Sequence, residues 1–193
     1  HHTQALAIAR EIGDRLSEEN RLANASRQLG QHAKAVEHFT QALAICRTTG
    51  NRNGEGACLN NLGVVYRSLG QHAKAVEHHT QALAIAREIG DRNGEGNSLG
   101  NLGNAYDSLG QYARAVEHHT QALAISREIG DRDGEGTFLG NLGSAYRALG
   151  QPVKSIEHYE KALVITREIG NRTSEATFLG NLGLTHLDDL DDA

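Results

Sequence analysis

The 193 residues include 19 Lys and Arg against 24 Asp and Glu, which gives a formal net charge of −5, and 38% are hydrophobic but only 4% aromatic. A negative protein repels phosphate backbones and anionic lipids, so neither nucleic acid nor a membrane is an expected partner. No apolar run approaches the roughly 18 residues of a membrane-spanning helix. Cys46 and Cys58 occupy positions where other copies of a repeat carry Ala, Ser, Thr or Phe, so we expect core residues and no structural disulfide, in a cytoplasmic protein.

A 40-residue period runs through the sequence. Gly70 and its copies at 40-residue intervals are each followed by Gln, and residues 71–110 and 111–150 agree at 31 of 40 positions. A period of this length is typical of repeat arrays, in which each repeat packs mainly against its neighbours. We therefore predict one array over residues 1–193.

The chain starts inside a repeat, because Thr3–Arg15 reads TQALAIAREIGDR, as Thr80–Arg92 does. Residues 1–13 are predicted to be the second helix of a truncated repeat. Residues 14–50 are predicted to be a degenerate or shortened repeat, because Asp14–Gln31 is three residues shorter than Asp91–Gln111. Either the repeat is degenerate or residues are missing from it.

Residues 51–90 form the first full repeat, and their apolar spacing predicts two helices. In residues 55–69 the apolar residues recur at intervals of three and four, which indicates an amphipathic helix. In residues 72–89 a broader apolar face indicates a helix that contacts several neighbours. The first set is Leu59, Leu62, Tyr66 and Leu69, and the second is Ala75, Val76, His79, Ala82, Leu83, Ala86 and Ile89.

Glycine and cap residues predict where these helices end. Gly70 and Gly90 stand just past the two helices and suit the left-handed residue that closes a helix. Asp91 or Asn93 can cap the next helix by accepting its free amide hydrogens. Pro152, the only proline, lies where a first helical turn begins and where its missing N–H costs nothing.

Two more full repeats, residues 91–130 and 131–170, follow the same pattern. Residues 171–193 are predicted to be the first helix of a further repeat that acts as a C-terminal cap, since Thr177–Gly183 repeats the TFLGNLG of Thr137–Gly143. A polar end suits the last helix of an array, and here it consists of Asp188, Asp189, Asp191 and Asp192.

These patterns resemble the tetratricopeptide repeat (TPR) family. Its Leu-Gly-x-x-Tyr signature is matched by Leu62, Gly63 and Tyr66 and by their copies, and its small pair by Ala75 and Ala82. The 40-residue length resembles Leu-Gly-Asn scaffolds, kinesin light chains and bacterial multidomain TPR regulators. The resemblance implies an all-α, right-handed superhelical solenoid of antiparallel helix pairs. It also implies protein binding in a concave groove.

The interior glycine of the signature has its own physical reason. A helix-interior glycine costs roughly 1 kcal/mol relative to alanine, so Gly63 and its copies Gly103, Gly143 and Gly183 require an offsetting gain. Without a Cβ, the partner helix can pack a side chain directly on the backbone. We therefore predict close helix approach at these glycines.

Each first helix has a second stripe opposite its core face, and the resemblance to the TPR family implies that this stripe lines the concave groove. Asparagine offers both a carbonyl and an amide, so a column of asparagines can bind the main chain of a peptide. Gly100, Gly140 and Gly180 are expected to leave room beside this column. The groove residues are Asn60, Asn61, Val64, Arg67, Asn97, Asn101, Asn104, Asp107, Thr137, Asn141, Ser144, Arg147 and Asn181.

Two alternatives stay open for these residues. The asparagines could recur because duplication copied them, and could bond neighbouring helices instead of a peptide. Arg67 and Arg147 could bind an acidic side chain, although Asp107 lies between them in the row and solvent-facing charge is also consistent with the pattern.

The other candidate sites fail on spacing, so we expect no metal, no cofactor and no catalysis. His78 and His79 point about 100° apart on a helix, unlike the i, i+4 pair of a zinc motif, and His79 occupies the position of Phe39 and Tyr159. Gly94-Glu95-Gly96 follows no strand and precedes no Lys-Ser or Lys-Thr, so it is not a phosphate loop. Neither cysteine has an activating neighbour in sequence.

The sequence therefore predicts a scaffold, not an enzyme, that holds a peptide or helix of a partner protein in its groove. Two alternatives remain. The array could be the sensor or autoinhibitory segment of a larger signalling protein, such as a nucleotide-binding regulator or a caspase-like protease. It could also be a self-assembling spacer that associates through its uncapped N-terminal helix.

Overall fold

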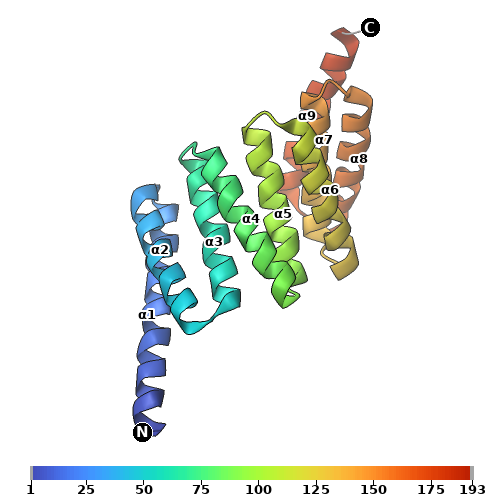
Figure 1. The fold of residues 1–193 in the computed structure, drawn as a ribbon. Coiled ribbons are helices and arrows are strands. Elements are labelled where there is room, and N and C mark those ends of the chain that lie inside the picture. Colours follow the sequence, from blue (N-terminus) through green and yellow to red (C-terminus); the bar gives the residue numbers. More distant parts are fainter. Residues whose placement is uncertain (1, 192–193) are drawn as a thin grey trace. The chain divides into compact units, whose positions relative to one another are not determined.

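The computed structural model describes the backbone of residues 2–191 and the side chains of residues 10–187. Over this part the chain forms nine α-helices and no strand (Figure 1). The helices are α1 His2–Gln28, α2 His32–Thr49, α3 Arg52–Ser68, α4 His72–Ile89, α5 Arg92–Ser108, α6 Tyr112–Ile129, α7 Arg132–Ala148, α8 Pro152–Glu168 and α9 Arg172–Asp191. The predicted all-α fold of helix pairs is confirmed.

Residue contacts divide the chain into two compact units, the first up to Gly94 and the second from Glu95 onward. In the first unit α1 packs on α2, α2 on α3 and α3 on α4. In the second unit α6 packs on α7, α7 on α8 and α8 on α9, and α7 also contacts α9. The helices of these pairs therefore pack mainly on their neighbours in the chain, as in a repeat array.

Glycines in the left-handed conformation close the helices, as predicted. Gly70 has φ 72° and Gly90 has φ 70°, a region that side-chain-bearing residues rarely adopt. After Gly90, the amide of Asp91 donates to the carbonyl of Ala86 at 2.9 Å, and its Oδ1 accepts from the Gly94 amide at 2.9 Å. Asp91 is thus the predicted cap, and Pro152 occupies the first turn of α8.

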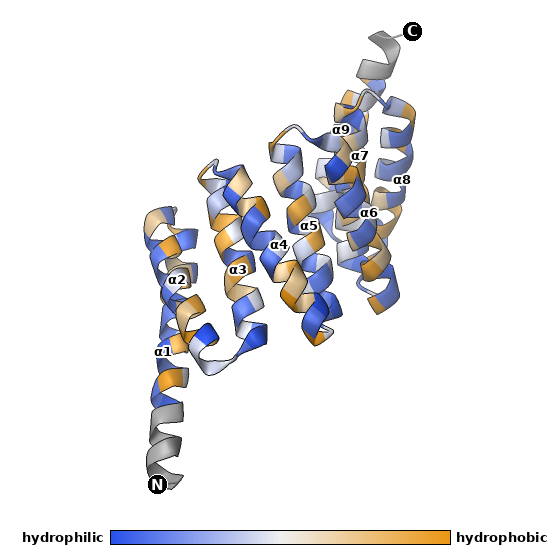
Figure 2. Ribbon diagram, viewed as in Figure 1, coloured by the Kyte–Doolittle hydropathy of each residue, from blue (hydrophilic) through white to orange (hydrophobic). Residues whose placement is uncertain are grey.

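The leucines of the apolar stripe are buried in the first helices α3, α5 and α7. Leu59 and Leu62 are 1% and 2% exposed, and the small residues Ala75 and Ala82 are buried beneath them. Leu69 differs from its prediction, because it follows the last residue of α3 and is 40% exposed. Figure 2 shows hydrophobic residues interspersed with hydrophilic ones along the helices, as expected of amphipathic helices.

The predicted helix boundary after residue 13 is wrong. Helix α1 is continuous through Gly13, which has no left-handed φ, and Ser17 Oγ donates to the Gly13 carbonyl at 2.9 Å. Asp14 and Arg15 follow Gly13 as Asp91 and Arg92 follow Gly90, but Leu16, Ser17 and Glu19 replace Asn93, Gly94 and Gly96. Glycine is a poor helix former, so these replacements favour an unbroken helix. The assignment of residues 14–50 to a degenerate repeat stays a prediction.

The C-terminal helix α9 extends to Asp191. The acidic cap predicted at Asp188, Asp189, Asp191 and Asp192 falls on residues whose side chains lie outside the described part of the chain. So does residue 193, and the division of residues 51–193 into repeats stays a prediction.

Candidate functional site

A buried ring lies on the interior glycine of each complete helix pair. A Cβ added to Gly63 would lie 2.5 Å from the ring of His79, and one added to Gly103 would lie 2.5 Å from the ring of His119. At Gly143 the ring of Tyr159 would lie 2.9 Å away. The close approach predicted at these glycines is confirmed. Gly183 is the exception, because an added Cβ would meet nothing within 4 Å.

The two buried histidines are packing residues, as predicted for His79. His79 is 0% exposed and His119 is 1% exposed. Burial lowers the pKa of each imidazole to about 4, with a further contribution from Arg67 at His79. Both rings are therefore neutral near pH 7 and take part in packing.

In the first unit, the groove residues lie on α3 above His79. Asn60 Oδ1 lies 2.8 Å from His79 Nδ1, so the neutral ring donates this hydrogen bond from its Nδ1–H. Asn61 and Val64 are half-buried, and Arg67 is exposed. The alternative in which an asparagine bonds a neighbouring helix is therefore realised at Asn60.

In the second unit, α5 and α7 carry the next groove residues side by side. Asn141 Nδ2 donates to Asn104 Oδ1 at 3.4 Å, a long and weak hydrogen bond between the two helices. Asn101 is half-buried at its place in the row, while Asn97 and Thr137 are exposed at the start of their helices. The asparagine column is thus partly bonded to itself and partly open.

Asp107 is half-buried near the end of α5. Burial raises the pKa of its carboxyl above the usual value. A carboxylate in this setting favours a cationic or hydrogen-bond-donating neighbour, so Asp107 gives this part of the face a preference for donors.

A hollow of about 350 Å³ opens at the end of α7, in the second unit. Its floor is Tyr159, whose hydroxyl lies 2.8 Å from Ser144 Oγ. Burial raises the pKa of Tyr159, while hydrogen bonds with Ser144 and Asn181 and the charge of Arg147 act in the opposite direction. The hollow is lined by Ser144, Arg147, Ala148, Tyr159 and Asn181, three of which are predicted groove residues.

The expected room beside Gly100 and Gly140 is filled by aromatic rings. A Cβ added to Gly100 would lie 2.3 Å from Phe138, and one added to Gly140 would lie 2.1 Å from Phe178. Each phenylalanine belongs to the next first helix, so these glycines serve packing between repeats and do not widen the groove. At Gly180 nothing lies within 4 Å of an added Cβ.

Glutamates at the start of the first helices are held by arginines. Glu135 is 8% exposed, and its two oxygens accept from Arg127 at 2.8 Å and from Arg132 at 2.5 Å. Burial alone would raise the pKa of Glu135, but the hydrogen bonds of the two arginines lower it. Glu55 and Glu175 are bound in the same way, so all three carboxylates are ionised and joined to the fold.

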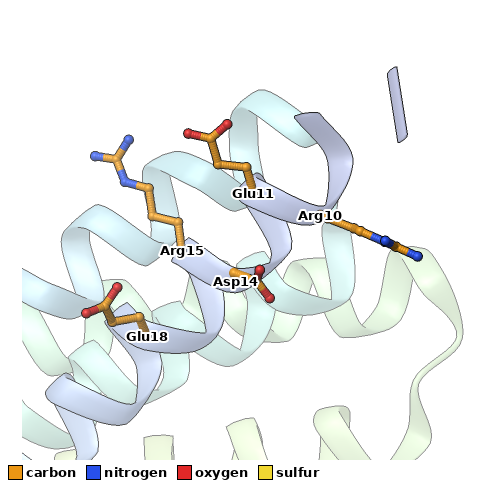
Figure 3. A pocket seen from close by; sticks show the side chains of 5 residues that line it. All are labelled: Arg10, Glu11, Asp14, Arg15 and Glu18. Carbon is orange, nitrogen blue, oxygen red and sulfur yellow. The ribbon is translucent and has the colours of Figure 1, made fainter. Parts of the chain in front are cut away.

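A larger hollow of about 630 Å³ lies on α1 and is lined by Arg10, Glu11, Asp14, Arg15 and Glu18 (Figure 3). All five side chains come from one helix and are exposed, so they do not enclose a ligand. Among the described residues, no group of three or more His, Cys, Asp or Glu side chains could hold a metal ion. Over the same residues, no helix combines the length and the apolar character of a membrane span.

Sequence reasoning missed Tyr159 as part of the hollow, because the other repeats carry buried core residues at its position. The signal was its chemistry, since the same slot holds Phe39, His79 and His119 in other copies, and only tyrosine brings a hydroxyl to this place.

Successive helix pairs, each with a buried ring packed on an interior glycine, define a helical repeat array. The family model of the tetratricopeptide repeat matches residues 14–88, 57–128 and 135–193. The chain therefore belongs to the tetratricopeptide repeat family. A comparison with curated protein sequences gives no match.

Solved structures with the same fold support this assignment. BtubC (BKLC) from P. vanneervenii has a TM-score of 0.85 and 20% sequence identity, over 98% of this chain and 79% of that one. A putative kinesin light chain of Podospora anserina with nearly identical TPR-like repeats has a TM-score of 0.76 and 26% identity, over 92% of this chain and 88% of that one. The similarity to kinesin light chain repeats is thus confirmed.

A Rap protein complexed with Competence and Sporulation Factor has a TM-score of 0.80 and 20% identity. The match covers 91% of this chain but 52% of that one, so this chain spans about half the length of the Rap protein. At this identity the likeness concerns the fold alone.

Proposed function

We propose that the chain is a protein-binding scaffold that holds a peptide or helix of a partner along the groove residues of its first helices. The observation that carries the proposal is the hollow over Tyr159 in the second unit, because residues predicted from the sequence alone line it. A concave site with a few polar groups over an aromatic floor is typical of ligand-binding surfaces.

The chemistry of this hollow suits a peptide. The amide of Asn181 can both donate to and accept from a peptide main chain, and Arg147 can bind a carboxylate. Tyr159 adds an apolar ring with a hydroxyl at the bottom. We therefore expect the second unit to prefer a segment with an acidic residue that enters the hollow next to an apolar one.

The groove residues do not all contribute equally to this proposal. Asn60 already binds His79, and Asn104 already accepts from Asn141, so part of their capacity is used within the fold. Asn181 likewise already forms a hydrogen bond with Tyr159. Asn181 and Arg147 line the hollow directly and are expected to matter most. The Rap protein, which has this fold and is complexed with a factor, supports the proposal by analogy.

The test begins with selection of binding peptides from a random display library against the wild-type chain. The affinities of the selected peptides are then measured by titration calorimetry for the wild type and for Asn181→Ala and Arg147→Ala. Loss of a hydrogen bond to a charged group costs about 1.5–3 kcal/mol, so we expect affinities roughly 10- to 100-fold weaker for Arg147→Ala.

Glu160→Ala serves as the matched control, because Glu160 is exposed on α8 and does not line the hollow. Its affinity for the peptides should equal that of the wild type. Peptides that bind all four proteins equally would contradict the groove proposal. That the array is a sensor or autoinhibitory segment of a larger signalling protein stays a prediction, as does a cytoplasmic location.

A further inference from the structure

Asp107, near the end of α5, is a half-buried carboxylate for which the described part of the chain supplies no cation. Burial raises the pKa of Asp107, and no positive neighbour among the described residues opposes that effect. Glu135 of the same unit differs, because burial would raise its pKa but two arginines bind the carboxylate and lower it. A partly buried charge without a counter-charge is unfavourable. Asp107 therefore has a capacity to bind a cation that the described residues leave unused.

Two contacts fix how α5 and α7 lie beside each other. A Cβ added to Gly100 would lie 2.3 Å from Phe138, and about one helical turn later Asn104 accepts from Asn141 at 3.4 Å. Both contacts advance in the same sense along the two helices, so α5 and α7 run parallel at this place. A residue of α5 therefore lies level with the residue of α7 that follows it by 37 positions in the chain.

This register places Asp107 level with Ser144, whose hydroxyl lies 2.8 Å from that of Tyr159 at the floor of the hollow. Arg147, which lines the hollow, follows Ser144 by about 4.5 Å along the axis of α7. Tyr159 is affected by both charges: burial is the main cause that raises its pKa, Asp107 raises it further, and Arg147 lowers it. An anion and a cation on two adjacent helices therefore lie beside one hollow.

We propose that Asp107 binds a lysine or arginine side chain of the partner peptide, about three residues away from the acidic residue that binds Arg147. This inference rests on the proposed peptide-binding function and specifies its ligand. Packed helices lie roughly 8–10 Å apart, which with the offset along α7 separates the two charged positions by roughly 10 Å. An extended peptide rises about 3.3 Å per residue, so about three residues span that distance. The bound segment is therefore extended across α5 and α7.

The opposite charges of Asp107 and Arg147 make this site selective. A uniformly acidic peptide would bring a negative charge to Asp107, and a uniformly basic peptide would bring a positive charge to Arg147. Like charges brought together in an interface are strongly unfavourable, so both kinds of peptide are disfavoured. The site should therefore select a segment that carries one charge of each sign, which an arginine alone would not do.

Peptides selected against the wild-type chain provide the probe. The tightest binder is synthesised with an acetylated N-terminus and a fluorescent label, together with versions in which its basic residue is replaced by glutamine or by glutamate. Fluorescence polarisation measures their affinities for the wild type, Asp107→Asn and Asp107→Lys. The parent peptide should bind Asp107→Asn roughly 10-fold or more weakly than the wild type, whereas the glutamine version should bind both equally. Asp107→Lys should prefer the glutamate version to the parent peptide.

Glu117→Gln is the matched control, because it makes the same change from carboxylate to amide at an exposed position of α6 outside the hollow. It should bind every peptide as the wild type does, and circular dichroism should show that all variants are folded. Selected peptides without a basic residue, or equal binding of the parent peptide to the wild type and Asp107→Asn, would overturn the proposal. If Arg147→Ala still weakens binding in that case, the peptide-binding function stands. Peptides insensitive to Arg147→Ala and Asn181→Ala would overturn that function, and this inference with it.

Discussion

Replacing an interior glycine by alanine should have opposite effects in two helices of the second unit. In Gly103→Ala the new Cβ would lie 2.5 Å from the ring of His119, well inside the 3.4 Å at which ordinary contact begins. The ring is buried, so it or the helix must move. In Gly183→Ala the new Cβ meets nothing within 4 Å.

Both substitutions gain the same helix propensity, because alanine is favoured over glycine in a helix by about 1 kcal/mol. Gly103→Ala adds the cost of overpacking, about 1–3 kcal/mol. The difference between the two variants isolates this cost. Since about 1 kcal/mol shifts Tm by roughly 2–4 °C in a chain of this size, Gly103→Ala should melt roughly 2–12 °C below Gly183→Ala.

Thermal unfolding followed by far-ultraviolet circular dichroism measures this difference. Gly183→Ala should equal or exceed the wild type in stability. Equal destabilisation of the two variants would refute the reasoning, because it would mean that the ring seat at Gly103 has no energetic consequence.

Three further experiments, two on variants and one on the wild type, test the buried polar groups. Glu135→Gln should lower the free energy of unfolding by roughly 1–3 kcal/mol at pH 7, since it weakens the hydrogen bonds from two arginines. Because the pKa of Glu135 is lowered in the folded state, this loss of stability should persist above the unfolded pKa and fade as the pH falls through the folded pKa. Urea titrations at several pH values measure it. His119 has a folded pKa of about 4, so its neutral ring stabilises the fold fully above pH 6.5. This contribution, up to about 3 kcal/mol, is lost as the pH falls toward 4. The stability of His119→Phe should therefore depend less on pH over this range, and an unchanged pH dependence would contradict the assignment. Burial raises the pKa of the Cys46 thiol and raises that of Cys58 to about 12. Neither thiol should therefore react with an aromatic disulfide reagent at pH 8 until urea unfolds the chain. Rapid reaction in the folded state would show that the reagent reaches the core.

The sequence predicts most of the helices and their ends because those features are local. Gly90 and Asp91 fix one helix end and the next helix start within a few residues, and the spacing of Leu59 and Leu62 identifies the buried stripe. Local signals also misled the prediction at residue 13, where Gly13 and Asp14 repeat Gly90 and Asp91 but Leu16 and Ser17 replace Asn93 and Gly94. A glycine and a cap residue are therefore not sufficient to end a helix, and α1 continues through them.

The features that sequence reasoning missed depend on contacts between different helices. Phe138 fills the space beside Gly100 from 38 positions further along the chain, and no pattern within one helix reveals that contact. Similarly, Asn60 was predicted to face a peptide, but its amide oxygen pairs with His79 in the other helix of the pair. Groove and packing positions adjoin on a helix, so the spacing alone does not separate them.

The arginines that hold the buried glutamates have a consequence for how the molecule responds to salt. Arg47 and Arg127 reach from the end of one helix pair to the carboxylate that starts the next, and both remain about half exposed to solvent. Ions in solution screen such exposed charges, whereas they leave the apolar contacts inside each pair almost unchanged. Ionic strength should therefore govern how many helix pairs unfold cooperatively. In dilute buffer several helix pairs should unfold in one transition, and in concentrated salt each helix pair should unfold more independently.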